Sequence, residues 1–98
     1  MRMINVRDEE TGDVVGRFNE DKATKVASSR TNSGFTWSEL YKTKGGKWVL
    51  AGITCYNGQR DTYRYIEQGA AMDFFTDYGA QENAHLYFDI NKFEEEVR

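Results

Sequence analysis

The sequence predicts an α+β domain in which a small antiparallel sheet of about five strands, built on hairpins, is packed by two or three short helices. Three observations support this prediction. Two apolar runs flank a glycine-rich turn at residues 44–47, two shorter runs surround a polar turn at residues 10–13, and apolar residues recur at helical spacing over residues 68–78. A length of 98 residues suits one modest core, so we expect a single domain over residues 1–98.

The N-terminal quarter opens with a hairpin. Residues 4–7 and 14–18 are rich in apolar and β-branched side chains and read as its two strands. After the second strand, Asn19 or Asp21 can accept a hydrogen bond as an N-cap, which predicts a short helix that ends near residue 28.

The central hairpin is the clearest element. Residues 35–43 and 48–56 flank Lys44-Gly45-Gly46-Lys47, and a Gly-Gly pair suits a two-residue turn that needs positive φ. Such a turn sets the register of the hairpin. It pairs Thr43 with Trp48, Tyr41 with Leu50, and Trp37 with Thr54.

This register predicts two different faces for the hairpin. One face is large and aromatic, and carries Phe35, Trp37, Tyr41, Trp48, Leu50 and Tyr56. The other is smaller and aliphatic, which suits packing under a helix, and carries Leu40, Val49, Ala51, Ile53 and Cys55. Either a second layer covers the aromatic face, or that face is an exposed interaction surface.

The C-terminal half begins with a short strand at residues 63–66. A helix over residues 68–78 follows, with Phe74 on its core face and Gly79 as its C-cap. The tail is compatible with two structures, because Leu86 and Ile90 fit both a strand and a helical face. We favour a strand through Ile90 and then a short helix that begins at Asn91, where Glu94 completes a capping box.

The residue types that perform most catalysis and metal binding are scarce. Cys55 is the single cysteine and His85 the single histidine, and they lie far apart in the sequence. Cys55 falls in an apolar stretch, so we expect a buried structural thiol. His85 reads as a surface or strand residue, and no pair of carboxylates stands out for acid–base chemistry. The sequence therefore predicts that the protein is not an enzyme and needs no cofactor or metal.

The expected compartment is the cytoplasm. No apolar run approaches the roughly 20 residues of a membrane span, and the first five residues lack the apolar stretch of a signal peptide. A single cysteine cannot form an internal disulfide, which agrees with a reducing environment.

The formal charge of -3 hides a strong segregation along the chain. Residues 1–21 hold three arginines against six carboxylates, residues 22–64 hold eight basic residues against two carboxylates, and residues 65–98 hold two against eight. Charge separation of this kind is informative about partners. The acidic parts suit a basic protein surface or imitate nucleic-acid phosphates, and the basic part coincides with the aromatic hairpin.

We therefore predict that the hairpin binds a macromolecule. Cations beside aromatic rings can neutralise phosphates while bases stack on the rings. The predicted partner-binding residues are Trp37, Tyr41, Lys44, Lys47, Trp48 and Tyr56. The alternative is that the rings form core and the lysines only solvate the hairpin.

Two segments resemble small orphan proteins of bacterial plasmids and phages. Residues 40–50, LYKTKGGKWVL, match their aromatic-rich hairpin, and residues 66–75, IEQGAAMDFF, match the Ile-led helix with paired alanines that follows it. The resemblance covers about half of the chain and concerns fold, so it transfers no site residues. Orphans of this kind include many anti-CRISPR proteins. The resemblance therefore implies an inhibitor that binds a protein partner, which would be a Cas effector such as Cas9 or its guide RNA complex. The alternative function is a small nucleic-acid-binding or regulatory module.

Overall fold

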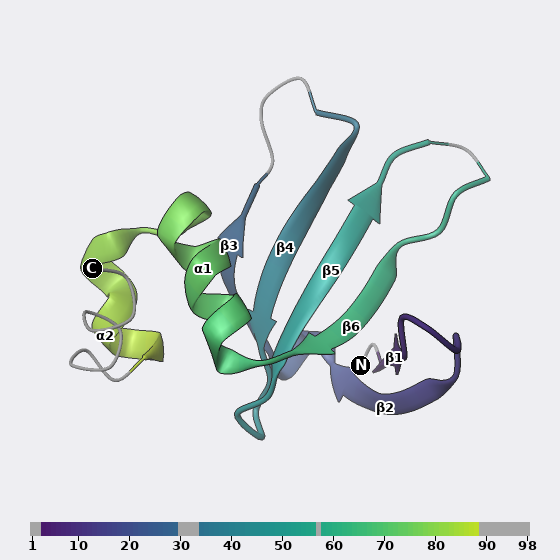
Figure 1. Ribbon diagram of the computed structural model, residues 1–98, viewed down its shortest axis with the longest axis horizontal. Helices are drawn as coiled ribbons and strands as arrows, with labels where there is room; N and C mark the ends of the chain where they lie inside the picture. Colours follow the sequence, from purple (N-terminus) through teal and green to yellow (C-terminus); the bar gives the residue numbers. More distant parts are fainter. Residues whose placement is uncertain (1–2, 30–33, 57, 89–98) are drawn as a thin grey trace.

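The computed structural model describes residues 3–29, 34–56 and 58–88 of the chain (Figure 1). Its elements in chain order are β1 (Met3–Arg7), β2 (Val14–Asn19), the 3-10 helix η1 (Glu20–Lys22), β3 (Thr24–Ser28), β4 (Thr36–Lys42), β5 (Trp48–Thr54), β6 (Thr62–Ile66), α1 (Gln68–Tyr78), the 3-10 helix η2 (Gln81–Asn83) and α2 (Ala84–Tyr87). The α+β class is confirmed. None of the helices in this described part combines the length and apolar character that a membrane crossing requires.

The strands divide between two antiparallel sheets instead of forming one sheet of about five strands. β3, β4, β5 and β6 pair in chain order, and β1 pairs with β2 in a separate hairpin that lies beside β6 (Figure 1). The predicted opening hairpin is confirmed. Its apolar side chains Ile4, Val6 and Phe18 are buried against one face of the larger sheet. The hairpin therefore adds a second layer and does not extend the four-stranded ladder.

The turn between β4 and β5 holds three residues, not two. The Thr43 N–H donates to the Lys47 carbonyl at 2.8 Å, and the Gly46 N–H donates to the Thr43 carbonyl at 2.9 Å. Gly46 adopts φ +86°, the left-handed conformation that closes a three-residue hairpin loop. Gly45 does not share this conformation, so only one of the two glycines meets the demand for positive φ that the sequence suggests.

The extra loop residue shifts the predicted register by one position. Tyr41 pairs with Val49 and Trp37 with Ile53, and Lys42 lies opposite Trp48. A shift of one residue moves a side chain to the other face relative to its partner strand. The single aromatic face predicted for the hairpin is therefore wrong, and Tyr41 and Trp48 lie on opposite faces of the sheet.

The first face of the sheet packs against the helices. We call this cluster the helix-side core, and it consists of Ala27, Leu40, Trp48, Ala71, Met72, Phe75, Ala84 and Phe88. The Trp48 and Phe88 rings stack with centroids 4.9 Å apart and an angle of 9° between their planes. Phe75 is fully buried and meets Phe88 at 5.4 Å.

α1 has the predicted bounds but a rotated core face. Phe74 packs against the helix-side core as predicted but is only half-buried, whereas its neighbour Phe75 is fully buried and lies at the centre of the core face. Gly79 ends the helix as predicted and donates its N–H to the Phe75 carbonyl. A Cβ at Gly79 would lie 2.2 Å from the Phe75 ring. The Phe75 ring can occupy its place in the core because Gly79, which follows the last turn of the helix, has no side chain to collide with it.

The opposite face of the sheet forms a second core with the opening hairpin. This hairpin-side core consists of Ile4, Val6, Phe18, Tyr41, Val49 and Ala51. The Phe18 ring lies 6.0 Å from the rings of both Tyr41 and Tyr63, in tilted contacts. A domain of this size covers both faces of one sheet by using large rings to fill each side.

The helix predicted through residue 28 is replaced by η1 and β3. Asn19 does act as an N-cap, accepting from the Asp21 N–H at 2.9 Å, but the helix lasts only three residues. β3 then pairs with β4, with a register shift between Lys25 and Ala27. The strand forms because pairing satisfies its backbone and places Ala27 in the helix-side core.

The segment after α1 is also helical where a strand was predicted. η2 and α2 follow each other directly, and Leu86 is exposed while Phe88 is buried. The alternating apolar residues that suggested a strand do not lie in one, because Phe88, at the end of the short helix α2, is buried while Leu86 is exposed. The predicted strand end at Ile90 and the helix beginning at Asn91 lie outside the described residues. The predicted strand at residues 63–66 is confirmed by β6.

Candidate functional site

The six residues predicted to bind a partner do not share a surface. Two of them are core, two lie at the β4–β5 turn, and two lie toward the other end of the hairpin. They are, in that order, Tyr41 and Trp48, Lys44 and Lys47, and Trp37 and Tyr56. The surface that the sequence suggested is therefore divided into separate parts.

Tyr41 and Trp48 are unsuited to direct contact with a partner. Only 8% of Tyr41 and 6% of Trp48 is exposed, and each belongs to a different core. Lys42 covers part of Trp48, with its Nζ 5.1 Å from the ring centroid, and also donates to the Tyr87 carbonyl at 3.0 Å. Both rings act as structure, which is the reading that the sequence left open as the alternative.

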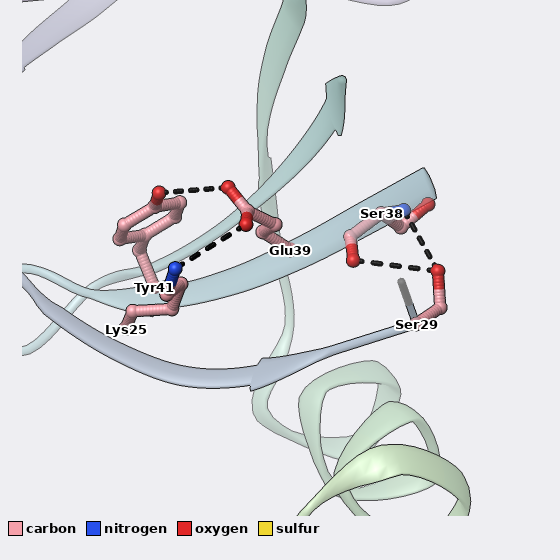
Figure 2. Close-up of polar contacts among 5 residues, drawn as sticks. All are labelled: Lys25, Ser29, Ser38, Glu39 and Tyr41. Carbon is pink, nitrogen blue, oxygen red and sulfur yellow. Dashed lines mark hydrogen bonds and ion pairs between the residues drawn. The ribbon is translucent and has the colours of Figure 1, made fainter. Parts of the chain in front are cut away.

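Glu39 organises the polar rim around Tyr41 (Figure 2). The Tyr41 hydroxyl donates to Glu39 Oε1 at 2.9 Å, and Lys25 Nζ lies 3.4 Å from Glu39 Oε2. Burial and the neighbouring Glu39 carboxylate raise the pKa of Tyr41 above its ordinary value. Further along the same strands, Ser29 Oγ accepts from the Ser38 N–H at 2.8 Å. The Lys25–Glu39 contact joins β3 to β4, and the Ser29–Ser38 contact joins the residue after β3 to β4, so the cluster stabilises the sheet edge.

The end of the hairpin opposite the turn carries a small exposed aromatic pair. Phe35 is 62% exposed and Tyr56 is 52% exposed, and their ring centroids are 5.8 Å apart. Trp37 is half-buried near this end. Cys55, beside the pair, is exposed, so the prediction of a buried thiol is wrong. Cys55 follows the last residue of β5 (Trp48–Thr54), beyond the buried part of the strand, and is therefore open to solvent.

The β4–β5 turn lies over a groove that the sequence did not reveal. We call this the turn groove; its volume is about 380 Å³, and four cationic side chains line it: Arg17, Lys22, Lys44 and Lys47. Two come from β2 and η1, and two from the turn. No carboxylate is among the lining residues, and none of the four cations forms an ion pair with another described residue.

The base of the turn groove is apolar and aromatic. Phe18, Tyr65 and the half-exposed Met3 line it. Lys47 Nζ lies 4.9 Å from the centroid of the Tyr65 ring, a cation–π contact that holds this side chain over the groove. Positive charge over a surface of low polarity is screened less than charge in open water. The groove is thus the part of the described surface best suited to an anion.

Arg17 and Lys22 are the residues that sequence reasoning missed. Arg17 belongs to the acidic segment of residues 1–21, where three arginines are outnumbered by six carboxylates. The carboxylates near Arg17 in the sequence gave no sign that it lies beside other cations in the folded protein. The alternation of β2 offered a signal, since buried Phe18 places Arg17 on the outer side of that strand.

A larger groove has a different character. It measures about 590 Å³ and lies between the β1–β2 turn and strands β5 and β6. Three arginines and three carboxylates line it: Arg7, Arg60, Arg64, Asp8, Glu9 and Asp61. Arg64 pairs with Glu9, and Asp61 accepts from the Thr54 N–H at 2.9 Å. Because its charges balance and partly satisfy one another, this groove favours no ligand charge.

The outer surface of α1 is acidic. Residues 67–82 contain four carboxylates and no lysine or arginine, and all four are exposed: Glu67, Asp73, Asp77 and Glu82. α1 packs on one face of the sheet, whereas Phe18 and Tyr65 of the turn groove belong to the other. The basic turn groove and the acidic α1 surface therefore lie on opposite sides of the sheet.

Catalytic and metal-binding groups are not gathered in the described part of the chain. His85 is exposed on α2, away from Cys55 on the β4–β5 hairpin. No cluster of three or more histidine, cysteine, aspartate or glutamate side chains there is arranged to hold a metal ion. Comparisons with known proteins found no matching family model, no similar curated protein and no similar solved structure.

Proposed function

We propose that this protein is a stoichiometric inhibitor from a mobile genetic element, of the anti-CRISPR kind, that acts in the cytoplasm by binding a Cas effector such as Cas9. The observation that carries the proposal is that the basic turn groove and the acidic α1 surface lie on opposite sides of the sheet. A Cas effector loaded with guide RNA presents both phosphates and the basic protein surfaces that hold nucleic acid. A small protein with a basic groove on one side and an acidic helix on the other can meet both.

The resemblance of residues 40–50 and 66–75 to small plasmid and phage orphans supports the same proposal. Inhibition by occupancy needs no catalytic group, only a surface complementary to one that the target uses. Charge complementarity contributes chiefly to the rate of association and to the choice of partner. The acidic α1 surface would face a basic nucleic-acid channel, and the turn groove would face RNA.

A cleavage assay with purified effectors of several types tests the proposal. We expect the protein to stop cleavage by at least one effector at near-equimolar ratio and to co-elute with it on gel filtration. Normal cleavage at large molar excess, with no complex on gel filtration, would remove the proposal for the effectors tried.

Two charge variants locate the contact within the proposal. Asp73→Lys with Asp77→Lys reverses two exposed charges on α1, and Lys44→Glu with Lys47→Glu reverses two at the turn. Each pair changes the formal charge by the same amount in opposite directions. If inhibition needs complementary charge on both sides, both variants lose inhibition while they keep near-native melting temperatures. A variant that inhibits normally would show that its side of the protein does not face the effector.

A further inference from the structure

We infer that the turn groove binds the phosphodiester backbone of single-stranded nucleic acid, and that it does so without reading the bases. This inference rests on the proposed function, because it names the anionic partner of the basic side. The juxtaposition that carries it is four cations, Arg17, Lys22, Lys44 and Lys47, around one hollow of about 380 Å³, with no ion pair between any of them and another described residue.

The arrangement of the cations favours a single strand. Arg17 and Lys22 come from β2 and η1, while Lys44 and Lys47 come from the β4–β5 turn, so two segments far apart in the sequence bring cations to the same groove. One backbone in the groove can meet cations from both segments. A duplex is too wide to enter a hollow of this size, and would meet only the rim.

The side-chain oxygens of Thr43 and Asn19, two neutral polar residues that line the groove, already accept hydrogen bonds within the fold. Thr43 Oγ1 accepts from the Lys47 N–H at 3.0 Å, and Asn19 Oδ1 accepts from the Asp21 N–H at 2.9 Å. Base recognition needs paired donors and acceptors directed at base edges, whereas phosphate recognition needs only positive charge. The groove therefore offers charge and little else, which predicts binding that is independent of sequence.

An acidic protein segment is the competing ligand for the same charge. Two features favour a phosphodiester. Each phosphate carries a full charge at every step of the backbone, so four cations in one small hollow can be matched by consecutive groups of one strand. Lys47 is held over the Tyr65 ring at 4.9 Å, which leaves the exposed apolar surface of Met3 in the groove for the sugars and bases that accompany phosphates.

The test is fluorescence anisotropy with labelled 20-nucleotide oligo-dT and oligo-rU, measured from 50 to 200 mM salt. For single strands the binding constant falls with a logarithmic slope of about −0.7 per phosphate contacted. Four contacts therefore predict a loss of about 50-fold over this range. Lys44→Glu with Lys47→Glu should leave two contacts at most and reduce the loss to about 7-fold.

The matched control is Arg60→Glu with Arg64→Glu, which changes the formal charge equally in the larger groove. This control should retain at least a third of the native affinity. An equal fall in both double variants would show that net charge, not the turn groove, governs binding, and would overturn the inference. So would the absence of binding at 50 mM salt. Arg17→Ala, which leaves the turn itself unchanged, should weaken binding several-fold; no change would remove Arg17 from the groove's function.

Two further arms separate the possible ligands. A blunt duplex of the same length that bound more tightly than oligo-dT would overturn the single-strand assignment. Poly-glutamate that competed as well as oligo-dT would assign the groove to acidic protein. The inference and the proposed function fail separately. If the protein binds oligonucleotides but inhibits no effector, the inhibitor proposal fails and the inference about the turn groove stands. If it inhibits an effector equally well with the turn variant and binds no oligonucleotide, the inference fails and the inhibitor proposal stands.

Discussion

Phe75 and Phe74 are adjacent phenylalanines whose replacement by alanine should have very different effects. Phe75 is fully buried in the helix-side core, where it meets Phe88 and Tyr87 with ring centroids 5.4 and 6.2 Å away. Its ring also lies against Gly79, which has no side chain to fill a vacated space. Phe75→Ala removes a buried ring and leaves a cavity, a change that costs about 3–5 kcal/mol.

Phe74 provides a control with the same chemical change on the same helix. It is half-buried, and its ring packs beside the exposed Tyr78 with centroids 4.9 Å apart. Its removal loses part of one side chain's burial and leaves a space open to water, so we expect a cost of about 1 kcal/mol. Both variants introduce alanine into the same helix, so the propensity gain largely cancels in the comparison.

The measurement is urea denaturation of the native protein and both variants, followed by far-UV circular dichroism. A domain of this size has a total stability of about 5–15 kcal/mol, so Phe75→Ala removes a large share of it. We expect the two variants to differ by at least about 2 kcal/mol, with similar denaturant slopes. A cost for Phe74→Ala that equals or exceeds the cost for Phe75→Ala would show that α1 presents a different face to the sheet.

Three further predictions follow from the fold. Gly46→Ala should destabilise the protein by about 1–2 kcal/mol in the same assay, because φ +86° is strained for a residue with a Cβ, whereas Gly45→Ala should be near neutral; equal effects would refute the three-residue turn. Trp48→Ala should cost about 3–5 kcal/mol, and a near-native melting temperature would show that this ring is surface and not core. Asp8 accepts from the Glu10 and Thr11 N–H groups, which lower the pKa of its carboxyl below the ordinary value of 3.8. A carboxyl whose pKa is lower in the folded than in the unfolded protein stabilises the fold above the unfolded pKa, and this stability is lost as pH falls through the folded pKa. The melting temperature of Asp8→Ala should therefore depend less on pH between 5 and 2 than that of the native protein. Parallel curves of melting temperature against pH would contradict this role.

The aromatic content of the chain has a structural use that limits its functional one. The sheet is covered on both faces, and each core depends on rings, with Trp48, Phe75 and Phe88 on one side and Phe18 and Tyr41 on the other. A stacking platform across the hairpin is therefore ruled out by packing. The described surface that remains for partners includes charge at the turn, charge on α1, and the exposed pair of Phe35 and Tyr56.

Local chemistry alone determined several elements from the sequence. The bounds of α1 and the positions of the β1–β2, β4–β5 and β6 strands follow from periodicity and from residues with strong local preferences, such as Gly79 after the helix and the glycines of the turns. Lys44 and Lys47 were placed at an exposed turn for the same reason, since a glycine-rich connection between two strands lies on the surface.

Only the tertiary structure decided which surfaces these elements present. The position of one left-handed glycine, Gly46, set a three-residue turn and thereby put Tyr41 and Trp48 on opposite faces. Pairing with β4 made a strand of residues that could have continued the helix capped by Asn19, because it satisfied their backbone groups in the sheet. The turn groove likewise exists because β2 brings Arg17 beside the turn, across a separation in sequence that no local pattern records. Local preferences are properties of neighbouring residues, whereas a face, a core and a groove are made by residues that meet only when the chain folds.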